Sequence, residues 1–128
     1  MKKALFIIFV LLCITLISSC GGDKKDLPSD RFVQFGNKII EIVDMYADYD
    51  ITAEQAYNKL EDLRTRESEL TDAEPGTDDN FNGSKMQNFI WNISLDLNSL
   101  KVEPSSERLK KLIENRNALA EFIGADKR

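Results

Sequence analysis

Alternating oxygen-bearing side chains make residues 78–83 the clearest candidate for metal binding in this sequence. Asp78, Asn80 and Asn82 alternate along the chain, and Gly83 follows directly. A twelve-residue calcium loop has oxygen ligands at positions 1, 3 and 5 and a glycine at position 6. The stretch therefore resembles the first half of a calcium loop, with one carboxylate among its ligands.

The second half of that pattern does not supply calcium ligands. Positions 9 and 12 fall on Met86 and Phe89, whose side chains carry no oxygen. An outside carboxylate such as Asp72 or Glu74 could complete a looser calcium site in the 72–83 loop. The competing interpretation is an Asn-Gly turn that leads from a polar loop into a helix. We favour the turn over the metal site.

Side chains that commonly carry out catalysis are scarce in this chain. It contains no histidine, and its two cysteines, Cys13 and Cys20, both lie near the amino terminus. This composition disfavours histidine-dependent triads, thiol chemistry and the usual zinc sites. The carboxylates fall where water should reach them, which is unfavourable for general acid catalysis. We expect no enzymatic activity and assign no catalytic residue.

The first 19 residues have the composition of a secretory signal peptide. Lys2 and Lys3 precede an almost unbroken apolar run over residues 4–17, and two serines follow it. An apolar run of about 14 residues between a positive start and small residues is typical of a cleaved signal. A permanent membrane-spanning helix needs roughly 20 apolar residues. We therefore predict that residues 1–19 are removed.

The sequence Ile17-Ser18-Ser19-Cys20 resembles the lipobox of bacterial lipoproteins, in which a small residue precedes an obligatory cysteine. The resemblance covers residues 1–20 only. It implies that the Cys20 thiol receives a diacylglycerol, that the chain is cut before this residue, and that the new amino terminus can receive a fatty acid such as palmitate. It places the protein in the cell membrane or the outer membrane, facing outside the cytoplasm. The alternative is an ordinary signal peptide with Cys20 merely nearby.

The mature chain is acidic. Without Lys2 and Lys3 it keeps 15 of the 17 basic side chains against 22 acidic ones, a formal net charge of −7. This balance disfavours nucleic acid as a partner and adhesion to anionic lipids, so the lipid on Cys20 would have to hold the protein at the bilayer. Residues 20–28 are expected to form a flexible tether, and residues 29–128 a single domain.

Apolar residues at spacings of three and four predict four helices in residues 29–128. The helices are expected after Ser29-Asp30, after a Thr52–Gln55 capping box, from Met86 onward, and from about Pro104 to a C-cap at Gly124. A long polar loop is expected over residues 70–84. The apolar stripes consist of Phe32, Phe35, Ile39, Ile42, Tyr46; Ala53, Ala56, Tyr57, Leu60, Leu63, Leu70; Met86, Ile90, Ile93, Leu97, Leu100; and Leu109, Leu112, Ile113, Leu119, Ala120, Ile123.

No stretch shows the sustained alternation of a strand. The fold class is therefore all-α, either a small antiparallel four-helix bundle or two packed helical hairpins.

The third predicted helix is apolar on two sides. Trp91 and Leu95 lie four residues apart and roughly opposite Ile93 and Leu97. Such a helix is either enclosed, or presents one side to something else. The simpler interpretation places Trp91 in the core, under another helix or the long loop. The alternative makes Trp91 and Leu95 a surface for a partner or for self-association, since tryptophan is a frequent interface anchor.

These observations favour a lipid-anchored, non-enzymatic protein-interaction module of the bacterial cell envelope, whose partner is an unidentified envelope protein. The alternative is a helical module that binds a small ligand, either an apolar molecule in the bundle core or calcium in the 72–83 loop.

Overall fold

The computed structural model describes residues 26–66, 70 and 72–128. The predicted signal peptide, Cys20 and most of the predicted tether therefore lie outside the described residues. Four helices make up the described chain: α2 (Asp30–Ala47), α3 (Ala53–Arg64), α5 (Asp78–Val102) and α6 (Ser106–Ile123). Among the described residues there is no strand, which confirms the all-α prediction.

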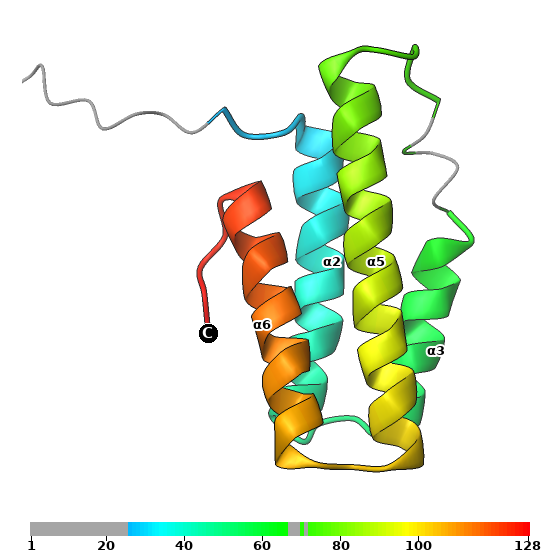
Figure 1. The fold of residues 1–128 in the computed structure, drawn as a ribbon, viewed down its shortest axis with the longest axis vertical. Helices are drawn as coiled ribbons and strands as arrows, with labels where there is room; N and C mark the ends of the chain where they lie inside the picture. The colour runs from blue at the N-terminus through cyan, green and yellow to red at the C-terminus, as the bar shows by residue number, and fades with distance from the viewer. Residues whose placement is uncertain (1–25, 67–69, 71) are drawn as a thin grey trace, which may run out of the picture.

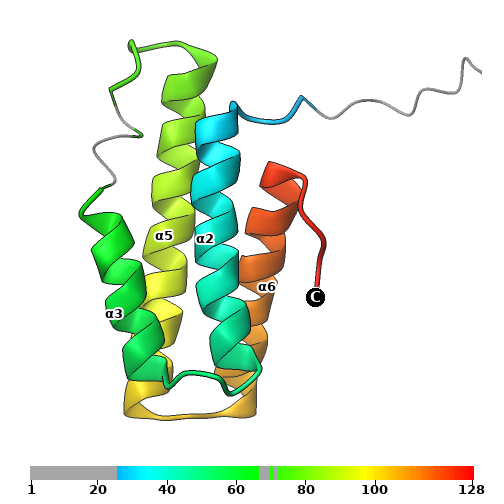
Figure 2. The ribbon, with the colours of Figure 1, turned by 180° about the vertical axis from the view of Figure 1, so that it is seen from behind.

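The helices form a small up-and-down bundle. Figures 1 and 2 show α2 and α5 running in one direction and α3 and α6 in the other. Helix α5 packs against both α3 and α6, and α2 closes the bundle against α6 and α3. The predicted antiparallel bundle is therefore confirmed. None of the described helices is long and apolar enough to cross a membrane.

The core is formed by the apolar stripes that the sequence predicts. Phe32, Ile39, Leu60, Ile93 and Leu119 are each completely buried. Burial of one such side chain stabilises the fold by roughly 1.5–3 kcal/mol, so packing between helices outweighs helix propensity here.

Local capping explains most of the helix ends. The Thr52 hydroxyl accepts a hydrogen bond from the Gln55 amide at 3.2 Å, and the Gln55 side chain accepts one from the Thr52 amide at 2.9 Å, which confirms the predicted capping box. Ser105 caps α6, and Gly124 ends it in the left-handed conformation at φ 73°. Ser29 occupies the N-cap position of α2 but makes no side-chain capping bond.

The start of α5 differs from the prediction. The polar loop was expected to reach residue 84, but α5 begins at Asp78, and Thr77 caps it by accepting a hydrogen bond from the Asn80 amide. Gly83 lies buried inside this helix rather than in a turn. A Cβ atom at Gly83 would stand 2.7 Å from the Leu70 carbonyl oxygen, so glycine lets that backbone segment approach the helix. Leu70 itself is buried at this contact.

Candidate functional site

Seven residues on the outward side of α5 repeat at alternating spacings of three and four. We call this set the α5 seam, and all seven side chains are exposed. Because such spacing averages 3.5 residues, the seam runs nearly straight along a helix about 37 Å long. Its members are Phe81, Ser84, Asn88, Trp91, Leu95, Asn98 and Val102.

The apolar members of the seam are open to solvent. The exposed fractions are 60% for Phe81, 55% for Trp91, 47% for Leu95 and 77% for Val102. The simpler interpretation, in which Trp91 belongs to the core, is therefore wrong. The reason is geometric: α5 packs against α3 and α6 through its other sides, and that packing leaves the side that carries Trp91 uncovered.

The middle of the seam and its surroundings carry no exposed charge. Six residues between Met86 and Leu100 are exposed, and none of them is charged, although 30% of the whole chain is charged. These six are Gln87, Asn88, Trp91, Asn92, Leu95 and Asn98. The nearest exposed charges on the helix, Lys85 and Lys101, are drawn to its flanks, where their ammonium groups lie 5.6 Å from the Phe122 ring and 4.9 Å from the Tyr57 ring. Uncharged amides and two large apolar side chains thus cover the middle of α5.

Polar contacts on both flanks fix the rotation of α5 about its axis. On the α3 side, the Ser94 hydroxyl donates a 2.8 Å hydrogen bond to the Glu61 carboxylate. On the α6 side, the Asn115 amide donates to the Asp96 carboxylate at 2.5 Å. Since Ser94 and Asp96 are nearly buried, these bonds also satisfy polar groups that water reaches poorly. The seam is therefore held facing outward.

The calcium candidates do not form a calcium loop. Asp78, Asn80 and Asn82 all lie in the first turns of α5. Successive helical residues turn by about 100°, so Asn80 points away from the side shared by the other two. The part of the chain that the structure describes also contains no cluster of three or more His, Cys, Asp or Glu side chains that could hold a metal ion. The Asn-Gly turn that we favoured is wrong as well, because both of its residues are helical.

A surface hollow lies beside the start of α5. Its volume is about 860 Å³, and its lining includes Asp30, Arg31, Glu74 and Thr77. Seven of its eight lining residues are polar or charged types. Two of them, Arg31 and Asp79, form a 3.1 Å ion pair with each other. This hollow is an open surface feature and does not extend into the apolar core where the alternative prediction places a ligand. The prediction of an apolar ligand in the core stays a prediction.

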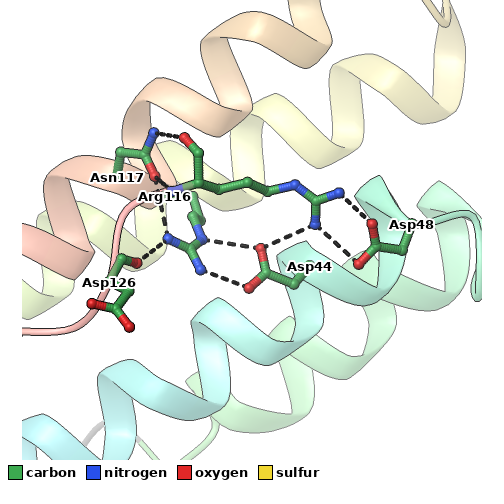
Figure 3. Close-up of polar contacts among 6 residues, drawn as sticks. Asp44, Asp48, Arg116, Asn117 and Asp126 are labelled. Carbon is green, nitrogen blue, oxygen red and sulfur yellow. Dashed lines mark hydrogen bonds and ion pairs between the residues drawn. The ribbon is translucent and has the colours of Figure 1, made fainter.

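A buried arginine that sequence analysis missed joins α6 to α2. Arg116 is only 6% exposed, and its Nε and Nη2 atoms donate to the two oxygens of Asp44 at 3.0 and 2.7 Å (Figure 3). Its Nη1 atom donates to the Asp126 carbonyl at 2.5 Å and so also binds the chain after α6. A signal was present in the sequence, because Arg116 falls at helical spacing between the buried Leu112 and Leu119.

The last residue continues this network. The Asn117 side chain exchanges two hydrogen bonds with the Arg128 backbone, at 2.8 and 2.9 Å. The Arg128 guanidinium donates to both oxygens of Asp48. The hydrogen bonds and positive charge of Arg128 lower the pKa of the Asp48 carboxyl, and Asp48 raises the pKa of Arg128. All of these groups are engaged with each other, so the network is structural and holds the tail against the bundle.

The structure thus assigns the predicted site residues to three different situations. Cys20 lies outside the described residues, the calcium candidates are helical, and Trp91 and Leu95 stand together at the centre of the α5 seam. In comparisons with known proteins, no family model, no curated protein and no solved structure matches this chain.

Proposed function

We propose that this chain is a lipid-anchored protein of the bacterial cell envelope, facing outside the cytoplasm, that acts without catalysis by binding protein through the α5 seam. The single observation that carries the proposal is the exposed pair Trp91 and Leu95 in an uncharged strip of a highly charged chain. Large apolar side chains left exposed together are characteristic of interaction surfaces, and tryptophan is enriched among the residues that dominate binding energy.

The position of the tether supports an anchor at one end of the bundle. Leu27 packs against Gly124, beside the end of the bundle where α2 begins. The eight residues 21–28 span at most about 28 Å when fully extended. An anchor at Cys20 would therefore keep the domain close to the bilayer, with the start of α2 nearest to it. The predicted diacylglycerol and the added acyl chain would make the attachment stable, because two or more chains are needed for lasting membrane binding.

The anchor is tested by Cys20→Ser in the full-length protein. The proposal predicts that wild type is found in the membrane fraction with a mass that includes the lipid. The variant should keep its signal peptide or appear in the soluble fraction, and should lack that mass. Wild type without a lipid mass on Cys20 would contradict the anchor.

The interaction is tested by placing a photo-cross-linking amino acid at Leu95 and irradiating intact cells. The matched control carries the same amino acid at Asn37, an exposed position on α2. The proposal predicts a discrete protein adduct from position 95 and none from position 37. Equal labelling, or no adduct at position 95, would count against the α5 seam as a binding surface.

A further inference from the structure

We infer that the partner of the α5 seam is a second copy of this chain, paired with its α5 parallel and in register. The inference deepens the proposed function, since it assigns the occupant of the same surface. It rests on the spacing of the seam, on the side chains at its polar positions, on the uncharged middle of the seam, and on the orientation that parallel copies share.

The spacing of the seam is that of a coiled-coil contact. Counted in heptads, Phe81, Asn88, Leu95 and Val102 occupy a positions. Ser84, Trp91 and Asn98 occupy d positions. This continuous series covers three heptads on a surface that the bundle itself does not use. Helices pair along such a seam because its side chains keep facing the partner as the two helices wind around each other.

The polar residues of the seam can form hydrogen bonds with the same residues of a second copy. An asparagine amide both donates and accepts hydrogen bonds, so two facing copies of Asn88 can satisfy one another. A single asparagine at an a position is a known determinant of register and of two-stranded association in coiled coils. A purely apolar partner would instead leave Asn88 and Asn98 without partners, which is unfavourable once they are buried.

Charge also favours a second copy on this side. The mature chain has a formal net charge of −7, from 15 basic and 22 acidic side chains, so two copies repel each other over most orientations. The flanking g and e positions between Lys85 and Lys101 are Gln87, Asn92, Ser94 and Ser99, all uncharged. Parallel pairing along the seam therefore brings no like charges together over the middle of the helix.

Parallel pairing of α5 is compatible with the anchoring of both copies in one membrane. In a parallel pair the two copies have the same orientation along α5, so both copies of the start of α2 lie at one end, which is also the end where α5 begins (Figures 1 and 2). Four apolar residues in three heptads form a weaker contact than a continuous apolar seam. Confinement of two anchored copies to one bilayer raises their effective concentration and offsets that weakness.

The test is same-residue disulfide formation in the full-length protein in bacterial membranes, with a mild oxidant. No cysteine occurs after Cys20, so each introduced cysteine gives a distinct signal. The variants are Ser84→Cys and Asn98→Cys, fourteen residues apart on the seam. The controls are wild type and Asn37→Cys on the exposed side of α2. Thermal melting confirms that each variant keeps the fold.

Parallel, in-register pairing predicts covalent dimers from both seam variants, at several times the level of both controls. A disulfide needs the two Cα atoms within about 4.4–6.8 Å, so an antiparallel pair cannot link both positions to themselves. Dimers from only one seam variant, or from neither, overturn the inference. If an adduct with a different protein still forms from position 95, the proposed function survives; if no adduct forms there, both fail.

Discussion

The guanidinium of Arg116 holds three parts of the chain together at the scale of single residues. It pairs with Asp44 on α2 while lying on α6, and it binds the Asp126 carbonyl in the tail. Because the Arg116 side chain is only 8% exposed, its charge depends on Asp44 for compensation. Removal of one partner from a buried pair strongly destabilises a protein, since the other charge is left unpaired.

Asp44→Asn should therefore lower the free energy of unfolding by about 3 kcal/mol, which urea denaturation can measure. The matched control is Glu114→Gln, which removes a pair with Lys110 whose side chains are 66% and 79% exposed. Exposed pairs of this kind contribute little, so the control should change stability by less than about 0.5 kcal/mol. A similar small change for Asp44→Asn would show that Arg116 does not need its partner.

The ion pair of Arg128 with Asp48 predicts that the stability of the fold depends on pH. The pKa of Asp48 is lowered, so the pair stabilises the fold above the unfolded pKa of about 3.9, and this contribution is lost as pH falls through the folded pKa. In Arg128→Gln the pKa of Asp48 should rise toward about 3.9, as measured by NMR titration of the carboxyl carbon. Lys127→Gln serves as the control and should leave this pKa unchanged. An unaltered pKa in Arg128→Gln would contradict the contact.

At the scale of elements, α2 and α6 approach closely at Gly36. A Cβ atom at this position would lie 2.9 Å from both Cδ1 and Cγ2 of Ile123. Glycine inside an exposed helix is normally less stable than alanine by about 1 kcal/mol. Its presence in α2 is explained by the space that the partner helix needs rather than by helix propensity.

Gly36→Ala should therefore destabilise the bundle by up to about 2 kcal/mol, because an overpacking cost of about 1–3 kcal/mol exceeds the roughly 1 kcal/mol gained in helix propensity. In an Ile123→Ala background, the same change should become neutral or stabilising, since the methyl then occupies vacated space. Urea denaturation of the four proteins measures this coupling. An equal loss of stability in both backgrounds would show that Ile123 does not restrict position 36.

The sequence predicts these elements well where periodicity and capping agree. Thr52 and Gly124 set helix ends as expected, because their interactions are local in sequence. The start of α5 could not be predicted in the same way. Asn82-Gly83 has the composition of a turn, but contact with the Leu70 backbone, twelve residues and more away, holds it in a helix. Tertiary packing thus overrides the local preference at this point.

At the scale of the whole molecule, α5 contributes side chains both to the core and to an exposed surface. One side of α5 supplies Met86, Ile90 and Ile93 to the core, and the other carries Trp91 and Leu95 outward. The two-sided apolar pattern was visible in the sequence. Which side faced solvent depended on how α3 and α6 pack, and this arrangement is a property of the bundle rather than of the helix.

The most direct measurement uses Trp91, the single tryptophan of the chain, as a probe of the α5 seam. Purified lipidated protein is placed in vesicles at increasing surface density, and quenching of its fluorescence by acrylamide is recorded. Our account predicts strong quenching at low density and protection at high density, because pairing buries Trp91. Leu95→Asp, which places like charges in the seam, should stay quenchable at every density. Protection of Trp91 even at the lowest density, or equal quenching at all densities, would contradict the account.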